Sequence, residues 1–195
     1  MNAGYHAILV ALTTGTLVLS FLAMSYRFWI RPRKPGGGAV WSSTDVVAVY
    51  SAVFGTVMLL LAAGSGLMLR PMEALLNSPI TKNKILCTVL ALVCWSSFLV
   101  LRLKVGPRLW ELRGLVRHYA YVMALAGLVF VVTASSIGGD LAGIPSGYEQ
   151  IGQAVGFRTR FTLYFPTAMN VLLWVIGVAA LGSVLLRVRL SRVKK

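Results

Sequence analysis

The sequence contains two histidines, His6 and His118, whose imidazole nitrogens are its strongest candidates for ligating a haem iron or a metal ion. His6 is followed by Thr13 and Ser20 at seven-residue spacing, so these three polar side chains share one face of a helix. A polar face on an apolar helix usually points into a bundle, where polar groups are often functional. The pattern predicts His6 either as an axial ligand of haem b or as a hydrogen-bonded residue at a helix end.

His118 lies between Arg117 and Tyr119 at the start of a later apolar run. In the topology derived below, the two histidines fall at opposite ends of their helices, on the order of 25–30 Å apart across a bilayer. One haem held by both is therefore not expected. We interpret His118 as an interfacial residue near the lipid headgroups.

The carboxylates all lie outside the middle of the apolar runs, which disfavours a pump or an ion-coupled transporter. Three of them fall on the same predicted side as His6 and are the outer-side polar candidates: Glu73, Asp140 and Glu149. No two of these have the spacing of metal ligands, so no metal site is predicted. The other two acids are Asp45 and Glu111.

The two cysteines, Cys87 and Cys94, stand seven residues apart and lack the C-x-x-C spacing of a redox or metal motif. They are interpreted as packing residues of one helix face. No phosphate-binding loop, dinucleotide fingerprint or hydrolase elbow occurs. The sequence predicts no catalytic residue, and we expect no catalytic activity of the chain's own.

The elements that must position these residues are apolar helices. The chain is 57% hydrophobic and 12% charged, with a mean hydropathy of +0.79, outside the range of soluble proteins. Its net charge of +14 comes from basic residues in the connections, where membrane topology places them, so nucleic acid is not an expected partner. We predict one all-α domain, residues 1–195, with five membrane spans: 5–26, 46–69, 85–101, 118–139 and 161–186.

The basic residues also predict an orientation. Fourteen of the 19 lysines and arginines fall in the first and third connections and the tail, on one side of the membrane. The positive-inside rule then places the N-terminus outside and the C-terminus in the cytoplasm. Thr44 and Asp45 are expected to cap the second span at its start.

The fourth span carries small residues along one line, within about 80° of one another around the helix. Such a face lets a neighbouring backbone approach closely. The opposite face carries Val122, Leu125, Val129 and Val132, which suit lipid or a bulkier partner. The predicted packing residues are Ala120, Ala124, Gly127, Ala134 and Gly138.

The order of four short motifs resembles a family of uncharacterised four-helix bacterial and archaeal membrane domains, some fused to Rieske iron–sulfur domains. The motifs are a histidine opening the first helix at His6, small residues at 62–66, an arginine closing the third helix at Arg102, and Gly-Gly-acid-Leu at 138–141. Family members often carry another histidine at the start of the third helix, where this chain has 81–84, Thr-Lys-Asn-Lys. The resemblance implies a prokaryotic cell membrane and an association with electron transport.

From these patterns we expect a non-catalytic integral subunit of a larger membrane complex, respiratory or otherwise redox-linked, with lipid and other membrane subunits as partners. The alternative is a haem-b electron-transfer protein in which His6 is an axial ligand. A small-solute channel or transporter is disfavoured, because the spans lack charge and show no internal repeat.

Overall fold

The computed structural model describes residues 3–29, 39–111 and 114–143. The predicted fifth span and Glu149 lie outside these residues. The described part consists of helices, joined by short connections. Its elements are α1 (Ala3–Trp29), α2 (Ala39–Met68), the short α3 (Met72–Asn77), α4 (Pro79–Val105), a 3₁₀ turn η1 (Pro107–Trp110) and α5 (Leu115–Leu141).

Four of these helices, α1, α2, α4 and α5, are long and apolar enough to cross a membrane. A helix of 27 residues, such as α1, α4 or α5, is about 40 Å long at 1.5 Å per residue. This exceeds a hydrocarbon core of about 30 Å, so roughly 5 Å of helix reaches the headgroup level at each end. The chain is a multi-pass membrane protein, and the first four predicted spans correspond to these four helices.

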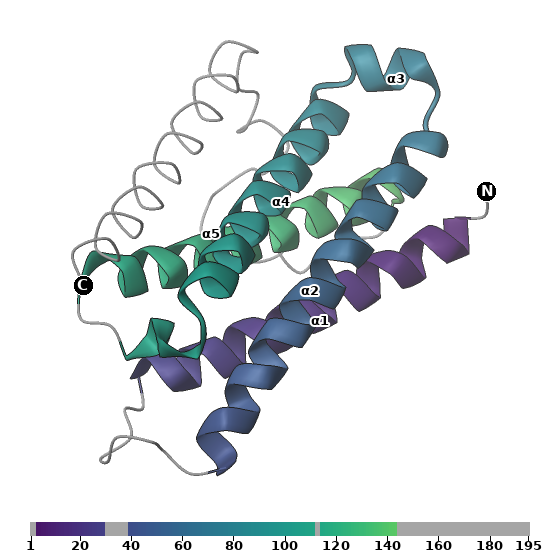
Figure 1. The fold of residues 1–195 in the computed structure, drawn as a ribbon. Coiled ribbons are helices and arrows are strands. Elements are labelled where there is room, and N and C mark those ends of the chain that lie inside the picture. The colour runs from purple at the N-terminus through teal and green to yellow at the C-terminus, as the bar shows by residue number, and fades with distance from the viewer. Residues whose placement is uncertain (1–2, 30–38, 112–113, 144–195) are drawn as a thin grey trace, which may run out of the picture.

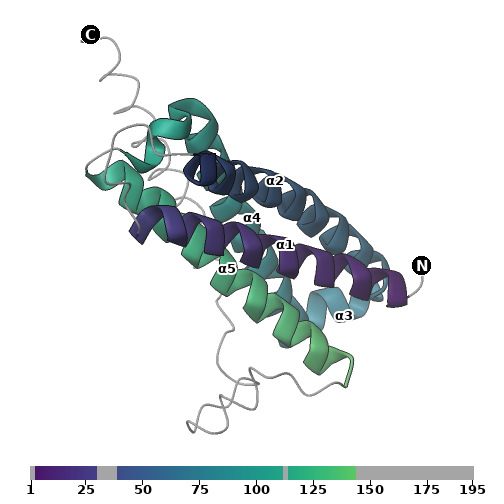
Figure 2. The ribbon, with the colours of Figure 1, turned by 90° about the horizontal axis from the view of Figure 1, so that it is seen from below.

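The four long helices form a bundle in which successive helices run in opposite directions (Figures 1 and 2). α1 packs along α2 and α4 packs along α5, while α2 against α4 and α1 against α5 complete the bundle. One end of the bundle holds His6 and the C-terminal turns of α2 and α5, and we call it the His6 end. The other end holds Asp45, and we call it the Asp45 end.

The core combines large side chains on α4 with small ones on α5. Trp95 and Phe98 are fully buried, and Trp95 lies against Gly127, where an added Cβ would be 2.8 Å from the indole ring. A second close contact joins α1 and α2, because a Cβ on Gly55 would be 2.6 Å from the Leu17 side chain. The close helix approach at these two positions therefore requires glycine.

The small-residue face of α5 is turned toward the bundle. Ala120, Ala124, Gly127 and Ala134 are buried, and Gly138 lies beside Lys84 of α4. On the opposite face, Val122, Leu125, Val129 and Val132 are exposed.

Each long helix differs from its predicted span at its ends, and the largest differences are at the starts of α2 and α4. α2 begins at Ala39, so Thr44 and Asp45 lie inside the helix, and the prediction that they cap it is wrong. α4 begins at Pro79, six residues before the predicted third span. There the Ser78 side chain accepts a hydrogen bond from the Thr81 amide, and proline occupies the first helical position.

Candidate functional site

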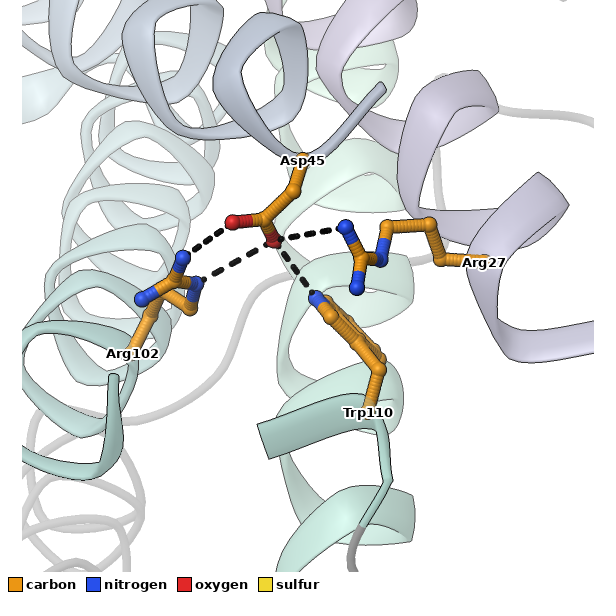
Figure 3. A network of polar contacts seen from close by, with 4 residues as sticks. All are labelled: Arg27, Asp45, Arg102 and Trp110. Atoms are coloured by element: carbon orange, nitrogen blue, oxygen red, sulfur yellow. Dashed lines mark hydrogen bonds and ion pairs between the residues drawn. The ribbon is translucent and has the colours of Figure 1, made fainter. Parts of the chain in front are cut away.

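Asp45 lies at the centre of a polar network at one end of the bundle (Figure 3). Its side chain is buried, and Arg102 of α4 donates to both carboxylate oxygens, with Nε 3.3 Å from Oδ1. Trp110 Nε1 donates to Oδ1 at 3.0 Å, and Arg27 Nη1 of α1 lies 3.7 Å from the same oxygen. One carboxylate thus joins α1, α2, α4 and η1.

This network can stabilise the bundle because both carboxylate oxygens of Asp45 have hydrogen-bond partners. A carboxylate removed from water carries a desolvation cost of several kcal/mol, which its partners must offset. The two-pronged contact with Arg102 and the Trp110 hydrogen bond together satisfy both oxygens of Asp45. The arrangement is therefore suited to clamping helices together, and it offers no exposed carboxylate for proton transfer.

Arg117 extends the basic character of the Asp45 end. Its side chain is buried, donates to the carbonyl oxygen of Phe28, and lies with its guanidinium carbon 4.2 Å from the centre of the Phe28 ring. The carbonyl belongs to the last turn of α1, where no helical partner remains for it. Arg117 thereby holds the end of α1 against the start of α5.

His118 lies beside this contact, on the exposed side. Its Nδ1 is 3.0 Å from the carbonyl oxygen of Gly114, and its ring meets Phe28 edge-on at 5.5 Å. Phe28 also stacks on Tyr121, with ring centres 4.2 Å apart. His118 is thus part of an aromatic cluster at the end of α1.

At the other end of the bundle, the His6 ring is held in a defined orientation. Its Nδ1 lies 2.8 Å from Ser65 Oγ, and the Ser65 hydroxyl donates to the carbonyl oxygen of Ala62 at 2.9 Å. Because the hydroxyl has one proton, Nδ1 must be the donor to Ser65, which leaves the lone pair of the neutral ring on Nε2. The ring also faces Gly66, where an added Cβ would be 3.1 Å from Cε1.

Two cations lie near the His6 ring. Arg70 donates from Nη2 to the carbonyl oxygen of Leu141 at 3.3 Å, which joins the end of α2 to the end of α5. Lys84 extends from α4 toward Gly138, where an added Cβ would be 2.9 Å from the ammonium nitrogen. Both side chains thus bring positive charge to the end of the bundle that holds His6.

Of the outer-side polar candidates, Glu73 and Asp140 are among the described residues and Glu149 is not. Glu73 is exposed on α3, and Asp140 lies in the last turn of α5. Within 3–29, 39–111 and 114–143, no three histidine, cysteine or acidic side chains are placed to hold a metal ion. Cys87 and Cys94 are buried thiols of α4.

The two histidines lie at opposite ends of the bundle. The hydroxyls of Thr14 and Ser135 are 3.2 Å apart, and Arg117 bonds to Phe28 further along α1. These two contacts show that α1 and α5 run antiparallel. His118 packs on Phe28, 22 residues and roughly 33 Å along α1 from His6. The chain has two histidines. Because they lie this far apart, they do not fit as paired ligands of one haem.

Sequence reasoning missed the Asp45 network, although one signal for it was present. The seven-residue series His6, Thr13, Ser20 continues to Arg27, and all three later members are buried. A buried arginine at that position requires a counter-charge. Asp45 is the first carboxylate in the sequence after it.

Comparison with protein-family models, with curated proteins and with solved structures gives no match. In the described residues, the structure agrees with the resemblance noted from the sequence only in being a bundle of four candidate membrane-spanning helices.

Proposed function

We propose that this chain is a non-catalytic integral subunit of a larger membrane complex, respiratory or otherwise redox-linked, in a prokaryotic cell membrane. The proposal is supported by the polar side chains of the described helices, which contact neighbouring helices. Ser20 donates to the carbonyl oxygen of Ala48, Thr14 meets Ser135, and Asp45 joins three long helices and η1. These groups hold helices together, as expected of a scaffold.

The outward faces of the helices support the same proposal. Large apolar side chains are exposed on them, including Tyr50 and Phe54 of α2 and Val129 of α5. A bilayer or a neighbouring subunit covers such faces in a membrane. The redox link rests on the four sequence motifs, and the cytoplasmic placement of the Asp45 end rests on its arginines and the positive-inside rule.

Photo-crosslinking within the native membrane tests the proposal. A photoreactive residue is placed at Tyr50 or at Val129, which face outward from different helices. We expect a discrete adduct with another polypeptide from at least one position, and a haem or iron–sulfur absorption spectrum in the complex purified with mild detergent. Lipid adducts alone, together with migration as a 21 kDa monomer or a homo-oligomer, would contradict the subunit assignment.

The geometry of His6 favours one second candidate, a haem-b electron-transfer protein. Its Nε2 lone pair is available, and the Ser65 contact at Nδ1 is the kind of second contact that orients a ligating histidine. The cations Arg70 and Lys84 nearby oppose binding of a ferric iron, and the second axial ligand would have to come from a residue other than histidine or from another chain. We therefore rank this candidate below the subunit.

An absorption spectrum of the purified protein decides between the two. If His6 ligates haem b, the Soret band should be lost in His6→Ala and kept in the matched variant His118→Ala. A wild-type protein purified without a Soret band rules out the haem assignment and leaves the subunit proposal standing.

A further inference from the structure

Lys84 is a cation whose counter-charge is missing from the part of the chain that the structure describes. It lies near the start of α4, partly buried, with its ammonium group against Gly138. Neither ion pair found among the described residues includes it, and its ammonium has no hydrogen bond there. A partly buried ammonium without a counter-charge among the described residues favours a ligand that supplies negative charge at this position.

The groups around Lys84 add positive charge. Lys84 of α4 lies beside Gly138, and Arg70, which follows the end of α2, donates to Leu141, so both side chains reach the last turn of α5 at the His6 end. Among the described residues, the Arg70 guanidinium donates one hydrogen bond, to the carbonyl oxygen of Leu141, which leaves further donors on it. Among the described residues, two acids lie at this end of the bundle: Glu73 is exposed, and Asp140, whose Oδ1 is buried, forms no ion pair there.

The depth of Lys84 indicates which anion is suitable. It lies five residues after Pro79, about 7.5 Å along a helix that extends roughly 5 Å beyond the hydrocarbon core at each end. This places the ammonium near the boundary between hydrocarbon and headgroups, where lipid phosphates lie. Basic pockets between membrane helices bind anionic headgroups in this way.

We propose that Lys84 and Arg70, at the His6 end of the bundle, form a binding site for a phosphate group. Lys84 supplies a compact charge and Arg70 supplies the planar donors that suit phosphate oxygens. The phosphate is that of an anionic lipid or a free phosphate, and the test separates these two sources.

The lipid arm uses the full-length protein in nanodiscs of phosphatidylcholine and phosphatidylglycerol. Native mass spectrometry measures the ratio of the two lipids retained. We expect phosphatidylglycerol to be enriched on the wild type, and Lys84→Gln to reduce this enrichment about tenfold, as loss of one charged hydrogen bond implies. Lys84→Arg should keep the enrichment. Lys104→Gln, the same change at the other end of α4, should leave it unaltered.

The free-phosphate arm uses delipidated protein in a neutral detergent at constant ionic strength. If the ligand is free phosphate, inorganic phosphate should raise the melting temperature of the wild type and of Lys104→Gln, and leave that of Lys84→Gln unchanged. A response in the lipid arm alone assigns the site to a lipid headgroup. Lack of a difference between wild type and Lys84→Gln in both arms overturns the proposal.

A purely internal role of Lys84 gives a different result. If Lys84 pairs with Asp140, then Lys84→Gln and Asp140→Asn should each lower the melting temperature in neutral detergent, and the double variant should be no worse than either. That outcome would overturn the proposal. An anion site predicts that Lys84→Gln melts no lower than the wild type when no anion is present, because the variant lacks an uncompensated charge.

Discussion

At the residue scale, Asp45 shows what a local sequence pattern can and cannot predict. A threonine and an aspartate ahead of an apolar run match the pattern of a helix cap, which led to the wrong prediction for 44 and 45. The hydrogen-bond partners of Asp45 are Arg102 and Trp110, 57 and 65 residues away in the sequence. No local pattern contains a contact of this length, so the network became visible only once the helices were packed.

Removing the charge of Asp45 should destabilise the bundle strongly. Asp45→Asn keeps the shape of the side chain and leaves the buried Arg102 without its counter-charge, which typically costs about 3–5 kcal/mol. The measurement is unfolding in detergent, with Glu111→Gln as the control, because it removes the same charge from an exposed position. A control variant as unstable as Asp45→Asn would show that net charge, and not the network, sets the stability.

The pairing with Arg102 gives a second, independent expectation. If the two side chains stabilise the bundle through each other, Asp45→Asn combined with Arg102→Gln should cost less than the two single changes together. Simple addition of the two costs would mean that Arg102 acts through other contacts.

At the scale of elements, polar contacts fix the register of α1 against α2. His6 meets Ser65, Ser20 donates to the carbonyl oxygen of Ala48 at 2.6 Å, and Arg27 lies near Asp45. These contacts occur at seven-residue intervals or multiples of them on α1, and a shift of one helix along the other would break all three. The sequence predicted the polar face of α1, but the matching positions on α2 follow no regular spacing.

The helix ends were predicted less well than the helices themselves. Hydropathy marks where an apolar run stops. A lysine or arginine followed most of the predicted spans, and Asp140 followed the fourth. In α4, however, Lys82, Lys84, Arg102 and Lys104 all lie inside the helix. The edge of the hydrocarbon core and the end of a helix are different boundaries, because a helix continues into the headgroup level.

The close contact between α4 and α5 should not tolerate a large side chain. Gly127→Leu places carbon atoms where the Trp95 ring lies, and overpacking of this kind costs about 1–3 kcal/mol. Val129→Leu, on the exposed face of α5, should change the free energy of unfolding by less than about 0.5 kcal/mol. Equal losses in the two variants would show that the glycine face is not a tight interface.

Two glycines of α2 should respond oppositely to the same substitution. Gly64 has open space where its Cβ would be, so Gly64→Ala should stabilise the helix by about 0.5–1 kcal/mol. At Gly55 the new methyl group would be 2.6 Å from Leu17, so Gly55→Ala should destabilise the bundle despite the same gain in helix propensity. Unfolding of both variants in one detergent measures the difference directly.

At the scale of the whole molecule, composition and hydropathy were enough to predict a helical membrane bundle. Apolar runs of this length have few alternatives in a bilayer, since every backbone polar group must be satisfied within the helix. The function is less predictable, because two histidines with no shared site and a buried ion-pair network are compatible with several roles. The function of a subunit depends on the surfaces that bind its partners, and these cannot be identified from one chain.

The distribution of charge between the two ends of the bundle predicts its orientation in the membrane. Arg27, Arg102 and Arg117 are buried at the Asp45 end, and the exposed Arg108 lies in η1 beside them. The positive-inside rule expects this end to face the cytoplasm, because basic connections are retained on that side.

Accessibility labelling of single cysteines tests this orientation, in a background in which Cys87 and Cys94 are replaced by alanine. Arg108→Cys and Glu73→Cys place the label at exposed positions at opposite ends of the bundle. In intact cells, a membrane-impermeant thiol reagent should label Glu73→Cys and reach Arg108→Cys only after the membrane is opened. The reverse pattern would invert the orientation, and labelling of both positions in intact cells would contradict a bundle that spans the membrane. Under the expected pattern, the proposed phosphate site at Lys84 faces the outer leaflet, while the Asp45 network lies at the cytoplasmic surface.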